Sequence, residues 1–375
     1  MSKVVIASDS YKGNMRSPIV CGIIEKGLKS IIPDIEIIKI PMADGGEGTV
    51  DSVIAATNGV LKKVTVTGPL GGKVVAEYGL IGQDIAIMEM ASASGIELVE
   101  KEDLNPLLAT TFGTGEVIKH IIENENIKEI IIGIGGSATV DGGCGMAQAL
   151  GYQLLDSSGK EIEVGGGNLA NIATISCDNV NENITNTKIR VASDVTNPLL
   201  GENGSAKIFG PQKGATPAMV DELESGLSNL QSILKSKELI KEDVAGDGAA
   251  GGLGLGIRAF CNATIESGAK LIIEAPNLKE HLIDSDLIIT GEGCTDGQTT
   301  NGKLCSVIAE TAKNANVPVV LLSGAIKGDI QHLLEIFDVA LSISSGHGSL
   351  EKAIAASQDD LLYTTQNIAK LFFNN

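Results

Sequence analysis

The sequence predicts an α/β protein with two domains, one of them discontinuous and the other inserted into it. The chain of 375 residues exceeds what one compact core usually holds. Buried strands followed by polar loops and amphipathic helices occur near both ends, a pattern typical of a mostly parallel sheet, whereas the middle contains strands joined by glycine and proline turns. We therefore expect residues 1–67 and 284–375 to form one domain and residues 68–283 to form the inserted one.

Two strand–loop–helix units open the chain. Lys3–Ala7 is predicted to be a buried strand, and Ser17 to cap a helix that has Pro18 in its first turn. Glu36–Ile40 is a second strand, followed by the glycine-rich loop 41–49 and a short helix. Because ligands bind at the loops after the strands of open α/β sheets, both loops are candidate binding segments.

The segment 129–151 carries the strongest local signal. A β-branched strand, Ile130–Ile132, runs into a turn that contains Gly135 and Gly136, and a helix start follows. Glycines let backbone N–H groups approach an anion, and the Ser137 hydroxyl adds a donor, so we predict a phosphate site. Two alternatives remain open: the alanine-ending form of the dinucleotide fingerprint, and a tight turn with no ligand.

The remaining elements follow from the same patterns. Strands are predicted over 61–67, 74–81, 85–90, 172–176, 189–192, 286–290, 317–322 and 339–343. Thr216 and Pro217 are expected to start a long amphipathic helix that ends near Leu234. The glycine-dense segment 246–256 has two equally supported interpretations, a second anion loop or a helix start packed too closely for side chains.

Acidic residues gather in the glycine-rich loops. They are Asp44, Glu47, Asp141, Asp194, Glu292 and Asp296. Any one of them alone is typical of a helix cap or a turn, but phosphoryl transfer requires carboxylates for magnesium, a base for the attacking hydroxyl, donors that cradle phosphate, and cations. Lysines must supply most of the cations, because the chain has only three arginines.

Two weaker signals accompany these acids. Gly297 to Lys303 has the spacing of a Walker A loop, but Leu304 stands where the loop needs a metal-binding hydroxyl. Lys303 is still expected to contact phosphate. His347, which lies between glycines, is the only one of the four histidines that we consider a catalytic candidate.

Composition excludes several classes of function. A net charge of −19 argues against nucleic acid and anionic membrane partners, since both require a positive field. Hydrophobic residues make up 43% and charged residues 20%, and no signal peptide or apolar span is apparent, so we expect a cytoplasmic globular protein. The six cysteines form no CxxC pair, and most of them are predicted to be free, buried thiols. The oligomeric state stays open, a homo-oligomer included.

Taken together, the loops resemble a known family. The matching segments are DSYKG at 9–13, PMADGGEGT at 41–49, GIGGSATVDGGCGMAQALG at 133–151, SDVTNPLLGENGSAKIFGPQKGA at 193–215, GDGAAGGLGLG at 246–256 and TGEGCTDGQTTNGK at 290–303. In this order they resemble the bacterial class-I glycerate kinases over almost the whole chain. The resemblance implies that ATP and Mg²⁺ are used to phosphorylate D-glycerate to 2-phosphoglycerate, in a cleft between two α/β domains. A kinase of a related hydroxy acid and a nucleotide-binding sensor with weak or lost turnover are the alternatives.

The resemblance also implies roles for individual residues. Asp194 and Lys12 are the catalytic candidates; Asp44, Glu47, Asn197 and Lys213 are expected to bind substrate; Gly135, Gly136, Ser137 and Lys303 to bind the nucleotide phosphates; and Glu292 and Asp296 to bind magnesium. The chain departs from the family's usual pattern where Cys294 replaces an arginine, where Cys305 and Ser8 replace prolines, and where Val140 replaces an asparagine. A thiol cannot replace a bidentate phosphate donor, so we expect either weak turnover or compensation by Lys303.

Overall fold

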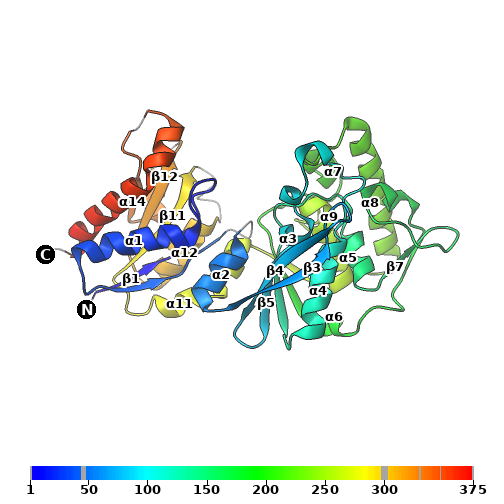
Figure 1. The fold of residues 1–375 in the computed structure, drawn as a ribbon, viewed down its shortest axis with the longest axis horizontal. Coiled ribbons are helices and arrows are strands. Elements are labelled where there is room, and N and C mark those ends of the chain that lie inside the picture. The colour runs from blue at the N-terminus through cyan, green and yellow to red at the C-terminus, as the bar shows by residue number, and fades with distance from the viewer. Residues whose placement is uncertain (1, 44–47, 297–302, 329–330, 347, 374–375) are drawn as a thin grey trace. The chain divides into compact units, whose positions relative to one another are not determined.

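The computed structural model describes residues 2–43, 48–296, 303–328, 331–346 and 348–373, which form two compact units (Figure 1). Within these residues, unit 1 contains 2–43, 51–59 and the part after Gly268, and unit 2 contains 48–50 and 60–268. Both units combine helices with sheets that contain parallel strands. The predicted α/β class and the insertion of one domain into the other are therefore confirmed.

Unit 1 is built on a five-stranded parallel sheet with the order β13-β12-β11-β1-β2. Its strands are β1 (Lys3–Ile6), β2 (Glu36–Lys39), β11 (Leu287–Thr295), β12 (Val319–Ile326) and β13 (Val339–Ser342). Its helices are α1 (Ser17–Ile31), α2 (Thr49–Thr57), whose first two residues group with unit 2, α10 (Gly268–Glu274), α11 (Leu278–His281), α12 (Leu304–Asn314), α13 (Leu333–Ile336) and α14 (Leu350–Phe373).

Helices cover both faces of this sheet. α1 and α14 pack side by side against the face that carries Val4 and Ile6 (Figure 1), whereas Cys305 of α12 meets Thr290 on the opposite face. Because both faces are covered, the three successive residues Val4–Ile6 of β1 are all apolar and buried, instead of alternating with polar ones. The chain runs from β1 to β2 in one direction and from β11 to β13 in the other, so the order reverses between β1 and β11. In open α/β sheets this point is where ligands bind.

Unit 2 is built on a six-stranded mixed sheet with the order β10-β9-β6-β5-β4-β3. Its strands are β3 (Val60–Thr67), β4 (Lys73–Ile81), β5 (Ile85–Glu89), β6 (Glu129–Gly133), β9 (Lys188–Ala192) and β10 (Thr264–Glu266), with a separate pair of β7 (Gln153–Leu155) and β8 (Thr174–Ser176). Its helices are α3 (Ala91–Ser94), η1 (Ile96–Leu98), η2 (Lys101–Asp103), α4 (Phe112–Asn124), α5 (Cys144–Ala149), η3 (Gly166–Asn171), α6 (Asn183–Asn186), α7 (Ser205–Phe209), η4 (Pro211–Lys213), α8 (Pro217–Ser236) and α9 (Ala249–Cys261).

The arrangement of this sheet brings several loops to one edge. β3, β4 and β5 form an antiparallel meander, while β5, β6, β9 and β10 run parallel. Gly133 pairs with Glu89 on one side and with Ala192 on the other, so these three strands end at the same level. The loops after β6 and β9, which contain Ser137 and Asp194, therefore leave the sheet as neighbours.

The boundaries between the units differ from the predicted ones. Residues 61–67 belong to β3, which pairs with β4 along its whole length and so lies in unit 2 rather than with the N-terminal segment. Residues 269–283 lie in unit 1, and the predicted boundary at 284 is therefore too late. Strand β11 also continues to Thr295 instead of ending at Thr290, because Glu292 and Cys294 pair with Ser323 and Ala325 of β12. Within the described residues, no helix is both long and apolar enough to cross a bilayer.

Candidate functional site

The loop after β6 presents unpaired backbone donors at the surface of unit 2. Gly135 and Gly136 are exposed, and the N–H groups of Gly135, Gly136 and Ser137 make no hydrogen bond to any described residue. The loop itself is fixed, since Ala138 N–H donates to Ser94 O at 3.0 Å and Ile96 N–H donates to Gly136 O at 2.8 Å. Gly136 has φ +74°, a left-handed conformation that turns successive N–H groups toward one side. Successive backbone N–H groups next to a residue in this conformation can form an anion-binding nest.

A buried lysine lies directly behind this loop. Lys213 is only 2% exposed, and its Nζ donates to Ser137 Oγ and to Thr139 O, each at 2.7 Å. Loss of hydration lowers the pKa of Lys213 to about 7, against a smaller upward effect of Asp141. Lys213 ends the short helix η4, and the next residue, Gly214, approaches so closely that a Cβ there would lie 2.3 Å from Leu104 O. The close packing of the next residue against Leu104 therefore fixes the backbone position of Lys213.

Asp141, a sequence candidate for a helix cap or a metal ligand, has a structural role. It is fully buried, and its carboxylate accepts hydrogen bonds from Thr111 N–H and Thr111 Oγ1 at 2.8 Å and from Gly143 N–H and Gly145 N–H at 3.2 and 3.3 Å. Burial raises its pKa, and these donors oppose that rise. Asp141 thus joins the start of α4 to the start of α5.

The dinucleotide alternative does not match the observed geometry. The fingerprint requires a helix that begins directly after the glycine turn, so that its N-terminus faces the pyrophosphate. Here Ser137 instead forms an isolated bridge with Gly95, and α5 begins only at Cys144. The acidic residue at the expected offset, Asp156, caps its own turn by accepting from Ser158 and Lys160.

The second glycine-dense segment is a packing element. A Cβ at Gly251 would lie 1.9 Å from Thr139 O, and Cβ atoms at Gly254 and Gly256 would lie 2.2 and 2.4 Å from the carbonyl oxygens of Gly246 and Gly142. Of the two interpretations left open, close packing is therefore correct for these positions. The segment also packs against the end of the loop that follows β6, where Gly142 N–H donates to Gly251 O at 3.0 Å.

Asp194 and Asn197 lie in the loop after β9, beside the anion loop. Asp194 is exposed, and its Oδ1 accepts from Ser267 Oγ at 3.0 Å and from Gly268 N–H at 3.1 Å. Asn197 is partly buried. Its side-chain Nδ2 donates to Asn203 O at 2.9 Å, and its backbone carbonyl oxygen accepts from Gly248 N–H at 3.0 Å. These bonds hold both side chains at the edge of the sheet that carries Ser137.

A second group of candidates lies in unit 1, where the strand order reverses. Lys12 is exposed in the loop after β1, and the backbone of Tyr11 and Lys12 lies 3.2 Å from where a Cβ at Gly293 would be. Glu292 is partly buried on β11, and its Oε1 accepts from Thr295 Oγ1 at 2.9 Å. The charge of Glu292 also contributes to the raised pKa of the buried Tyr11. The structure therefore brings Lys12 and Glu292 to the same loop region.

The other unit 1 candidates lie on either side of undescribed residues. Asp296 is partly buried directly after β11, Lys303 is exposed at the N-cap of α12, and Cys294 is exposed on β11. Asp44, Glu47, His347 and the glycines of the Walker-like segment lie outside the described residues. Among the residues that are described, no three His, Cys, Asp or Glu side chains come together as a metal cage. All six cysteines are free, and four of them are buried as predicted, whereas Cys177 and Cys294 are exposed.

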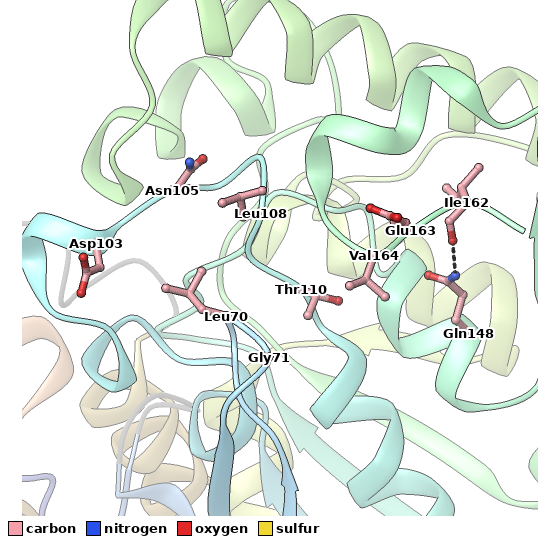
Figure 2. Close-up of a pocket in the computed structure, with 10 residues that line it drawn as sticks. All are labelled: Leu70, Gly71, Asp103, Asn105, Leu108, Thr110, Gln148, Ile162, Glu163 and Val164. Carbon is pink, nitrogen blue, oxygen red and sulfur yellow. Dashed lines mark hydrogen bonds between the residues drawn. The ribbon is translucent and has the colours of Figure 1, made fainter.

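Unit 2 also contains an open pocket of about 760 Å³ (Figure 2). Its lining consists of Leu70, Gly71, Asp103, Asn105, Leu108, Thr110, Gln148, Ile162, Glu163 and Val164. Leu108 is 63% exposed there, and the lining contains apolar, amide and acidic groups but neither lysine nor arginine. In Figure 2, Gln148 Nε2 donates to Ile162 O at one end of the pocket, while Asp103 and Asn105 lie at the other. Such a surface suits a neutral, partly apolar ligand group and disfavours phosphate.

Two features of the site were not predicted. Nothing in the sequence around Lys213 indicates that it is buried, since lysine between glutamine and glycine is typical of an exposed turn. Asp9 was included in a motif but not chosen as a candidate, although its N–H donates to Gly291 O at 2.8 Å and its carboxylate accepts from Ser10 N–H at 2.6 Å. Its position in the loop after the buried strand β1 is the signal that would have marked Asp9 as a candidate site residue.

Comparisons with known proteins agree with this architecture. A profile described as "Glycerate kinase family" matches residues 4–373. The chain is 44% identical to the glycerate 2-kinase of Escherichia coli K12, over 98% of this chain and 97% of that protein, and 45% identical to a glycerate kinase of Halalkalibacterium halodurans, over 98% of each. A crystal structure titled as a putative glycerate kinase 2 from Salmonella typhimurium LT2 superposes with a TM-score of 0.90 at 42% identity, covering 99% of this chain and 98% of that one. The chain therefore belongs to the glycerate kinase family.

Proposed function

We propose that this protein transfers a phosphoryl group from ATP to D-glycerate and forms 2-phosphoglycerate. The observation that carries the proposal is the loop Gly135–Ser137, whose N–H groups bond to no described residue and lie next to a buried lysine, in a chain that matches glycerate kinases over almost its full length. Phosphoryl transfer depends mainly on positioning and on charge stabilisation, which such a loop supplies.

The described residues fit both ends of ATP. The row of donors at Gly135 to Ser137 suits the phosphates, and Lys303, at the N-cap of the 11-residue helix α12, is a further candidate for a phosphate contact. The pocket of Figure 2 suits the nucleoside, because it offers apolar walls, amides and carboxylates that can accept from ribose hydroxyls. The segment that contains Asp103 and Asn105 packs against Gly214 through Leu104, and so reaches the neighbour of Lys213.

Magnesium fits the acidic residues of unit 1. Mg²⁺ usually binds one or two carboxylates and completes its shell with water and substrate phosphates, so it does not need a cage of three protein ligands. Glu292 and Asp296 would hold it, and the bound ion would neutralise charge on the transferring phosphoryl group. Asp44 and Glu47 remain candidates for the glycerate hydroxyls on the basis of the resemblance.

The protein's own residues would carry the remaining steps. Asp194 is the proposed base or orienter for the 2-hydroxyl of glycerate, and the bonds from Ser267 and Gly268 fix its carboxylate. Lys12, exposed beside Glu292, is proposed to stabilise developing negative charge, and Asn197 to donate to the substrate. Lys213 is proposed to belong to the substrate-binding residues and to act through its hydrogen bond to Ser137.

A coupled assay tests the proposal. Purified protein with ATP, Mg²⁺ and D-glycerate should produce ADP, and ³¹P NMR of the product should show 2-phosphoglycerate rather than the 3-isomer. Turnover with a different hydroxy acid at a higher kcat/KM would favour a related kinase. Binding of ATP without turnover of any acid would favour a sensor, the alternative that rests on Cys294 in place of the family's arginine.

A pair of variants tests the nucleoside pocket. Leu108→Asp should raise the KM for ATP about tenfold and leave the KM for D-glycerate unchanged, because a charge would replace an apolar contact with the base. Leu98→Asp is the matched control, since Leu98 is 43% exposed in unit 2 but does not line the pocket. An unchanged KM for ATP in Leu108→Asp would remove the pocket from the proposal.

A further inference from the structure

Lys213 combines burial with the absence of a paired carboxylate. Its Nζ makes two hydrogen bonds, to Ser137 Oγ and Thr139 O, and Lys213 forms no ion pair with any described residue. Asp141 is the one carboxylate that raises its pKa, and that carboxylate is already occupied by donors from Thr111, Gly143 and Gly145. A buried ammonium without a counter-ion is costly, so the arrangement is poised for an anion that arrives from outside.

The hydrogen-bond directions show how that anion would be reached. When Lys213 is charged it can only donate, so in that state Ser137 Oγ is the acceptor in the bond between them. Ser137 makes no other side-chain bond to a described residue, and its own hydroxyl proton therefore remains available for donation. Ser137 is 7% exposed and continues the row of free N–H groups at Gly135 and Gly136. The hydroxyl and the N–H groups can thus donate hydrogen bonds to the same anionic group of a ligand.

We propose that Lys213 is a positioning residue that holds Ser137 as a donor to a bound anion, and that binding of this anion is accompanied by uptake of one proton on Lys213. The inference rests on the proposed function for the identity of the anion, which is either a phosphate of ATP or the carboxylate of D-glycerate. Burial lowers the pKa of Lys213 to about 7, so without ligand the lysine is mostly neutral at pH 8. An anion next to Ser137 favours the charged form, so binding at pH 8 draws a proton from the buffer.

Calorimetric titration in two buffers of different ionisation enthalpy tests this at pH 8. ATP and D-glycerate are titrated separately and without turnover, and the dependence of the binding enthalpy on the buffer gives the number of protons taken up. Phosphate groups are almost fully ionised at pH 8, since their second pKa is about 6, so they contribute little to that number. We expect net proton uptake, of at most one proton, for the ligand whose anion contacts Ser137, and none for the other.

Three variants separate positioning from a structural role. Lys213→Met should abolish proton uptake, whereas the control Lys207→Met, which removes a partly exposed lysine of the neighbouring helix α7 that pairs with Glu202, should keep it. Ser137→Ala should keep the lysine but weaken binding of that ligand about tenfold or more. Lys213→Arg, which retains a charge, should restore part of the affinity but show no uptake, because arginine does not deprotonate.

The outcomes are distinct from those of the activity assay. If turnover of D-glycerate is normal but neither ligand is bound with proton uptake, or if Lys213→Met keeps the uptake, the role of Lys213 is refuted while the kinase function stands. If no acid is turned over but ATP binding takes up a proton that Lys213→Met loses, the proposed function fails and the anion site remains. Unchanged affinity in Ser137→Ala would overturn the positioning role.

Discussion

Two glycine-rich segments of unit 2 have similar composition and opposite environments. Gly135 and Gly136 are exposed, and their N–H groups have no partner among the described residues, whereas Gly251, Gly254 and Gly256 are buried against backbone carbonyl oxygens. In the first segment the missing side chain leaves space for the anion that we propose to bind there, and in the second it lets another part of the same chain approach closely. Glycine content alone therefore does not identify an anion site. What distinguishes the two segments is whether a backbone carbonyl oxygen or solvent faces the glycines, and whether their N–H groups are hydrogen-bonded.

The largest effect is expected at the packed segment. Gly251→Ala would place a Cβ 1.9 Å from Thr139 O at a residue with φ +74°, so both steric overlap and backbone strain oppose it. We expect a loss of about 3–5 kcal/mol, which corresponds to a melting temperature roughly 10 °C lower by calorimetry. A stable Gly251→Ala protein would show that the two segments are not in contact as described.

At the exposed segment the effect should fall on function instead. Gly136→Ala also introduces a side chain at φ +74°, but its nearest neighbour is the Ala91 Cβ at 3.3 Å, so stability should fall by only about 1–2 kcal/mol. Activity should fall more than tenfold, because the N–H groups that cradle phosphate would be displaced. The control Gly201→Ala, with φ +92° and open space around it, should lose similar stability and keep its activity.

The buried lysine behind the exposed segment should make stability depend on pH. Its pKa is about 7 in the folded protein and about 10.4 when unfolded, so between these values the unfolded state binds more protons. Wild-type stability should therefore rise with pH above 7, by at most about 1.4 kcal/mol per unit from this group. Lys213→Met should lack that rise, and its stability relative to wild type should be highest near pH 6. Urea unfolding from pH 6 to 9, with Lys207→Met as the control, measures the difference.

The smallest structural effect is expected in unit 1. Cys294 is exposed on β11, so Cys294→Arg should change the melting temperature by about 1 °C or less. The added guanidinium restores a phosphate donor that the family usually has, and kcat/KM should rise a few-fold. Cys177→Arg, at another exposed cysteine, is the control. No gain from Cys294→Arg would mean that the thiol does not limit the reaction.

Much of the fold followed from local patterns. The predicted strands around Ile130–Ile132, Ile189–Ala192 and Val339–Ile343 are all present, and the helix predicted from Thr216 is α8, with Thr216 as its cap. These predictions succeeded because alternation, caps and proline act within a few residues. Strand β11 was predicted too short, since Gly291 and Gly293 look like turn residues until their close approach to β12 and to the loop after β1 is known.

For the candidate site, the sequence by itself determined the type of chemistry: glycine turns, loop carboxylates and lysines that suit a phosphorylated ligand. Only the tertiary structure decided which of these groups face a ligand and which hold the protein together. Asp141 and the segment at Gly251 have structural roles, since their contacts hold neighbouring loops in place. Lys213 donates a hydrogen bond to Ser137 although 76 residues separate them in the chain. Burial and hydrogen-bond partners come from segments distant in sequence, and local composition cannot specify them.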